Sequence, residues 1–128
     1  MYERALAELR AGRKTGHWMW FVFPQLAGLG VSPTARRYAI SGLDEARAYL
    51  AEPVLGPRLA ECCDALLGLG SAASAESVLG GIDALKLRSS MTLFLRADDD
   101  ARRCRAVLER FYDGVADGAT DRLLAAAD

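Results

Sequence analysis

The chain has 128 residues, 52% of them hydrophobic and 26% charged, which is the composition of one folded domain and excludes a disordered chain. Its 16 basic and 17 acidic residues nearly balance, so bulk electrostatics give no reason to expect nucleic acid or a membrane surface as a partner. No stretch approaches the roughly 20 apolar residues that cross a bilayer, and we expect a cytoplasmic protein.

Helical signals begin at the first residues. An apolar stripe predicts a helix over residues 2–10, and Gly12 is of the type that commonly ends one. Ser32, followed by a proline suited to the first helical position, predicts a short helix that runs through Tyr38.

The remaining elements are also helical. Ser41 and Asp44 form an S-x-x-D box that predicts the start of a helix ending near Ala51. Further helices are predicted over residues 54–69, 75–79, 83–95, 101–112 and 120–127, with the acidic run 98–100 capping the fourth of these. Strand and hairpin signals are nearly absent. We therefore predict an all-α fold, an irregular compact multi-helix bundle that forms a single domain over residues 1–128.

The three cysteines do not predict a disulfide framework or a metal site. Cys62 and Cys63 are adjacent and Cys104 is distant, and this odd set lacks the C-x-x-C spacing of a zinc knuckle. They are interpreted as small buried hydrophobes in a reducing compartment. We expect no metal and no cofactor.

The first segment of interest is an aromatic run bordered by polar residues. The run over residues 18–23 follows three basic or titratable side chains and precedes an amide. A tryptophan face beside cations can hold a base or a sugar phosphate, and a buried core is the alternative interpretation. The candidate binding residues here are Arg13, Lys14, Trp18, Trp20 and Gln25.

His17 is the only histidine of the chain, which excludes a site with several histidine ligands. Two roles remain open for it: a structural hydrogen-bonded residue, or a catalytic acid or base.

The second segment is the helix predicted after Gly80 and Gly81. Asp83, Lys86 and Ser90 lie within about 60° of one another around its axis, at the edge of its apolar stripe. Partly buried charges of this kind must be paired or bind something. Asp83 is the second catalytic candidate, and the binding candidates are Lys86, Ser89 and Ser90; the alternative is a helix-capping aspartate followed by a Lys–Ser hydrogen bond.

The two lysines of the chain connect these segments. Of 16 basic residues only Lys14 and Lys86 are lysines, and each lies in one of the two segments. An ammonium is a compact charge that an arginine does not replace. We predict that the two segments meet in space.

Several strings of the sequence resemble a known family. They are Gly12-Arg13-Lys14, the run from His17 to Leu26, residues 46–50, and the run from Lys86 to Phe94. They are similar to the bacterial family catalogued as domain of unknown function 1810. This resemblance implies a compact all-helical fold and no established activity. Some relatives carry the label calpastatin, which is wrong on physical grounds because calpastatin is disordered and this composition requires a core.

The family comparison also bears on the start of the chain. Members of the family have further residues before the position of Tyr2, so we expect that an N-terminal helix common in the family is missing here. The apolar side of residues 2–10 would then be uncovered, which predicts a homodimer.

Two functional hypotheses follow, and the residues leave open whether the protein is an enzyme. The first is a site for an anionic small molecule such as a nucleotide or a sugar phosphate, with hydrolysis by His17 or Asp83 as its enzymatic form. The second is a non-enzymatic interaction or structural domain in which both segments are core. A cavity lined by both segments would favour the first.

Overall fold

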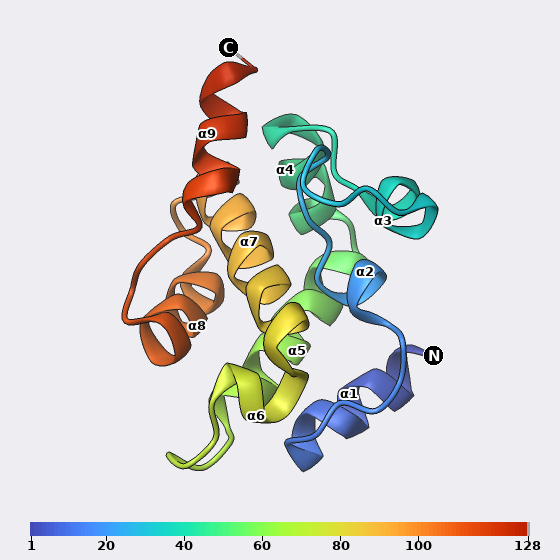
Figure 1. Cartoon of the computed structure of the whole chain (residues 1–128), viewed down its shortest axis with the longest axis vertical. Coiled ribbons are helices and arrows are strands. Elements are labelled where there is room, and N and C mark those ends of the chain that lie inside the picture. The colour runs from blue at the N-terminus through green and yellow to red at the C-terminus, as the bar shows by residue number, and fades with distance from the viewer. Residues whose placement is uncertain (128) are drawn as a thin grey trace.

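Helix caps and the spacing of apolar residues divide the chain into short helices. Figure 1 shows their arrangement in a computed structural model, which describes residues 1–127. Over these residues the fold is all-α, as predicted, and its one β-bridge joins Leu26 to Ile40. The helices are α1 (Tyr2–Ala11), α2 (Met19–Val22), α3 (Pro33–Tyr38), α4 (Leu43–Ala51), α5 (Leu55–Leu67), α6 (Ala75–Leu79), α7 (Gly81–Ala97), α8 (Arg102–Tyr112) and α9 (Gly118–Ala126). No helix in the described part of the chain is long and apolar enough to span a bilayer.

Helix α7 is the centre of the fold. Every residue from Ser89 to Leu95 is buried, so this part of α7 is enclosed on all sides. It contacts α4, α6, α8 and α9, and it lies between them in Figure 1. Side chains on the first turns of α7 are therefore carried by a helix that is packed against four others.

Helix α1 covers part of α5 with its own apolar face. Leu6 and Leu9 are buried in this contact, and the chain leaves α1 through Gly12 at a φ of 78°, a conformation that favours glycine. The expectation that the apolar side of residues 2–10 is uncovered is therefore wrong. This removes the argument from that face for a homodimer.

The predicted helix starts are correct in some places and wrong in others. The Ser32 hydroxyl accepts a hydrogen bond from the backbone N–H of Ala35 at 3.1 Å, as predicted. The S-x-x-D box is wrong, because α4 begins after Gly42 and the N–H of Ser41 donates to Glu45 instead. The acidic cap over residues 98–100 is also wrong, because α8 begins after Ala101, which provides no side-chain cap.

The aromatic run is only partly buried. Only its middle is helical, and while Trp18, Met19, Val22 and Phe23 are buried, Trp20 is half-buried. The run therefore forms part of the core and presents one tryptophan at the surface.

Candidate functional site

One carboxylate shapes the loop between α1 and α2. Glu8 Oε1 accepts hydrogen bonds from the N–H groups of Thr15 at 2.7 Å and Gly16 at 2.9 Å, and from Trp18 Nε1 at 2.9 Å. These bonds lower the pKa of Glu8 to about 2, and the bond from the Gly16 N–H contributes most. A Cβ at Gly16 would lie 3.0 Å from Cδ1 of Trp18, so the loop also needs a small residue here.

The loop is tied to the start of the central helix. The N–H of Lys14 donates to the carbonyl of Val78 in α6 at 2.8 Å. Helix α6 passes into α7 through Gly80, whose φ of 86° makes the sharp turn. The loop and the first turn of α7 are thus held next to each other by backbone geometry.

The N-terminus of α7 has no side-chain cap. Among the described residues, the backbone N–H groups of Gly81, Ile82 and Asp83 have no hydrogen-bond acceptor. These groups form the positive end of a helix of 17 residues. Such an end attracts an anion.

An ion cluster joins the two segments. Lys14 Nζ lies 2.8 Å from Asp83 Oδ2, and Lys86 Nζ lies 3.5 Å from Asp83 Oδ1. The side chains of Lys14, Asp83 and Lys86 are 10%, 17% and 25% exposed. Two ammonium groups thus face one carboxylate, which leaves one positive charge in excess. The prediction that the two lysine-bearing segments meet in space is confirmed.

Both lysines lie over tryptophan rings. Lys14 Nζ is 5.2 Å from the ring centroid of Trp18, and Lys86 Nζ is 5.1 Å from that of Trp20. Cation–π contacts at these distances hold the ammonium groups in place. Because Trp20 is half-buried, part of its ring remains available to a ligand.

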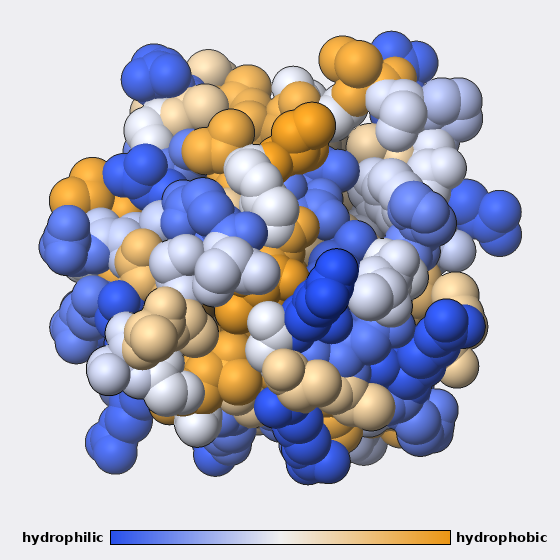
Figure 2. All heavy atoms as spheres, turned by 60° about the horizontal axis from the view of Figure 1, so that its bottom comes forward, coloured by the Kyte–Doolittle hydropathy of each residue, from blue (hydrophilic) through white to orange (hydrophobic). Residues whose placement is uncertain are grey.

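An open cavity of about 390 Å³ lies at this junction, and both segments line it. It is lined by Lys14, His17, Met19, Trp20, Leu79, Gly80, Gly81, Ile82, Asp83 and Lys86. Figure 2 views the molecule from the end at which α1 and α6 lie, where apolar side chains are exposed between hydrophilic ones. The cavity combines a positive charge, an aromatic ring and free N–H groups.

The other predicted site residues lie outside this cavity. Arg13 is exposed, Trp18 is buried with its N–H on Glu8, and the backbone carbonyl of Gln25 accepts from Ile40. The Ser89 hydroxyl is hydrogen-bonded to the Leu85 carbonyl and to Asp117, toward α9. Ser90 is fully buried on the face of α7 that carries Asp83 and Lys86, and its hydroxyl has no hydrogen-bond partner.

Two features of the site escaped prediction. Glu8 contacts residues seven to ten positions away, and an isolated glutamate on an amphipathic helix gives no signal for that role. The free N–H groups had a signal, since Gly80, the residue before α7, has no side chain that could cap them.

The described residues contain no group of three histidine, cysteine or acidic side chains placed to hold a metal. The cavity offers positive charge, an aromatic ring for stacking and the His17 imidazole.

Comparisons with known proteins give a family and a related structure. A family model described as "Protein of unknown function (DUF1810)" matches residues 1–124. The chain is similar to the crystal structure of the conserved hypothetical protein Rv1873 from Mycobacterium tuberculosis, with 54% sequence identity and a TM-score of 0.94. This similarity covers 97% of this chain and 88% of the other. The comparison with curated proteins returns no match.

Proposed function

The chain belongs to the DUF1810 family, whose description assigns no activity, and we propose that it binds a small anionic ligand of the nucleotide or sugar-phosphate type at the junction of the α1–α2 loop and α7. The observation that carries this proposal is the Lys14–Asp83–Lys86 cluster beside the uncapped start of α7. Both features favour negative charge, and they line one cavity.

The two lysines have different roles in this proposal. Lys14 is the more buried and makes the shorter contact with Asp83, so it holds the loop against α7. Lys86 is more exposed and its contact with Asp83 is 3.5 Å long. An ammonium has three donors, so Lys86 retains donors for a phosphate oxygen. Lys86 is the ligand-binding cation, and the Lys14–Asp83 pair positions the elements around it.

The ring of Trp20 supports a ligand with a planar or sugar component. It is half-buried at the cavity wall with Lys86 across its face. Stacking on an aromatic ring contributes roughly 1–3 kcal/mol for a nucleobase. Trp18 has no such role in the proposal because it is buried and bonded to Glu8.

His17 supports the enzymatic form of the proposal. It is exposed at the cavity, whereas the Asp83 carboxylate is already paired with two ammonium groups. Hydrolysis of a bound ligand would therefore use His17 as the acid or base. In the alternative, the domain is purely structural. The burial of Trp18 and Phe23 in the core agrees with it, but the position of Lys86 on the wall of an open cavity favours ligand binding.

A binding experiment tests the proposal. The protein is titrated calorimetrically with inorganic phosphate, ribose 5-phosphate, AMP and ADP, and the tightest of these is retained as the probe. Lys86→Met should lower the affinity for the probe at least about tenfold, the size of one charge-assisted hydrogen bond. Its stability should stay within about 1 kcal/mol of the wild type.

The matched control is Arg13→Met. It removes one positive charge from the same region, but Arg13 is exposed and does not line the cavity. The control should bind the probe as the wild type does. Equal losses in both variants would indicate general electrostatic attraction and contradict the proposed site, as would the absence of binding for all four compounds.

A further inference from the structure

Three sulfur atoms from three different helices gather in the core, away from the cavity described above. The Cys63 thiol of α5 donates a hydrogen bond to Met91 Sδ of α7 at 3.7 Å. Cys104, on α8, lies across the α5–α8 contact and lines one cavity with Cys63. Cys63 and Met91 are fully buried and Cys104 is 3% exposed. The three cysteines of the chain, Cys62 included, are free thiols.

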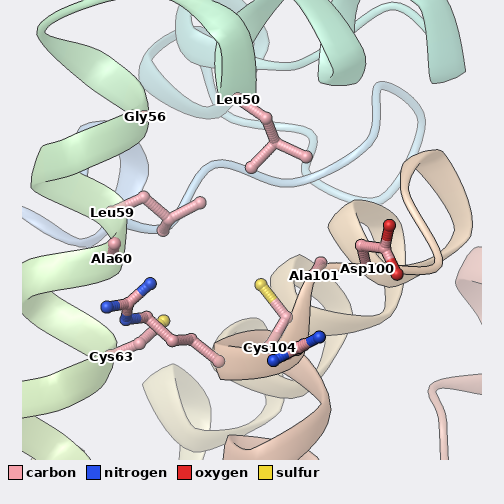
Figure 3. A pocket seen from close by; sticks show the side chains of 10 residues that line it. Leu50, Gly56, Leu59, Ala60, Cys63, Asp100, Ala101 and Cys104 are labelled. Atoms are coloured by element: carbon pink, nitrogen blue, oxygen red, sulfur yellow. The ribbon is translucent and has the colours of Figure 1, made fainter.

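A second cavity gives access to two of these sulfurs. It has a volume of about 170 Å³, lies between α5 and α8, and is lined by both Cys63 and Cys104. Figure 3 shows the Cys104 side chain projecting from α8 into this space, with Cys63 on the facing helix. Arg102 and Arg103 also line it. A small ion that enters here meets two thiols, and the Met91 thioether, which does not line the cavity, contacts the Cys63 sulfur.

We propose that Cys63, Cys104 and Met91 form a binding site for one Cu(I) ion. Thiolate and thioether sulfurs are the soft ligands that Cu(I) prefers, and it accepts low coordination numbers. Each cysteine bonded to the metal loses its proton to solvent, so one Cu(I) and two thiols give an anionic dithiolate complex and two protons. No electron is transferred, and Met91 binds as a neutral ligand.

The composition of the cluster selects Cu(I) over Zn(II). Zinc sites use four ligands drawn from cysteine, histidine and carboxylates, and the described residues contain no three such groups placed together. The complex carries one negative charge. The Arg103 guanidinium is already paired with Asp64 at 2.9 Å, so Arg102 is the cation at the cavity that offsets this charge.

The test is an anaerobic titration in which the reduced protein competes for Cu(I) with the chromophoric chelator bathocuproine disulfonate. The wild type should withdraw one Cu(I) per chain. Cys104→Ala should withdraw none. Met91→Leu, a nearly isosteric change, should bind at least about tenfold more weakly, because even partners outside the ligand shell contribute about 10–100-fold.

Cys62→Ala is the matched control, since Cys62 is as buried as Cys63 but lines a different cavity, with Tyr2 and Tyr49. It should bind Cu(I) as the wild type does. A wild type that withdraws no copper would overturn the proposal, and so would equal loss in Cys62→Ala and Cys104→Ala. Circular dichroism establishes that each variant is folded, and Met91→Leu keeps the test decisive if Cys104→Ala does not fold.

Discussion

The Lys14–Asp83 pair makes the sharpest stability prediction, because it connects the α1–α2 loop to the central helix at 2.8 Å. Asp83→Asn keeps the side-chain size but leaves Lys14 and Lys86 facing each other without a carboxylate. Exposed ion pairs contribute about 0.2–1 kcal/mol, and breaking a fully buried one costs about 3–5 kcal/mol. The Lys14 side chain is 10% exposed and that of Asp83 is 17% exposed, so we expect an intermediate loss of about 2–3 kcal/mol.

Urea denaturation followed by circular dichroism measures this loss. With a slope of about 1–3 kcal/mol per molar urea, the midpoint should fall by about 0.7 M or more. Lys14→Met should cost less than Asp83→Asn, because Asp83 keeps Lys86 as a partner. The double variant should be less destabilised than the sum of the two single variants, with a coupling of about 1 kcal/mol or more.

Asp44→Asn is the control for this experiment. Asp44 pairs with Arg47 at a similar distance, 2.9 Å, but is fully exposed, so its loss should stay within about 0.5 kcal/mol. The reasoning is refuted if Asp83→Asn costs no more than Asp44→Asn, or if the Lys14 and Asp83 losses are additive.

Two further predictions concern the stability of the fold. The folded state lowers the pKa of Glu8 from 4.5 to about 2, so its contribution to stability is complete above pH 4.5 and is lost as the pH falls toward 2. Urea midpoints measured over this range should fall less steeply for Glu8→Gln than for the wild type, and parallel curves would contradict the role of the carboxylate. A Cβ at Gly56 would lie 2.2 Å from the Leu50 carbonyl oxygen, so Gly56→Ala should lose at least about 2 kcal/mol in thermal melts. Gly81→Ala meets no atom within 4 Å and should stay within about 0.5 kcal/mol, and equal melting temperatures would show that the α4–α5 turn is not constrained.

Local signals in the sequence predicted the fold where one residue determines the geometry. Gly12 ends α1 because a residue without a Cβ adopts a positive φ at little cost, and Ser32 begins α3 because its hydroxyl caps the helix. The start of α4 could not be predicted in this way, because Ser41 and Gly42 are both acceptable before a helix and Glu45 decides between them by bonding the N–H of Ser41.

The part of the site on α7 could be predicted because its polar residues lie at the edge of an apolar stripe of that helix. Helical spacing correctly grouped Asp83 and Lys86, and the scarcity of lysine pointed to Lys14 as their partner. Spacing does not tell which distant element packs against a given face. For example, the Ser89 hydroxyl bonds to Asp117, 28 positions further along the chain, and the residues around Ser89 gave no sign of that contact.

The most direct test of the central claim is a two-dimensional ¹H–¹⁵N spectrum recorded while AMP or inorganic phosphate is added. We expect the largest changes in chemical shift at the backbone N–H groups of Gly81 and Ile82, and a change at the Trp20 indole when AMP is added. The Trp18 indole should change little because Glu8 already binds it. Changes that cluster instead at the start of α4, around Gly42, or no changes at all, would contradict an anion site at the start of α7.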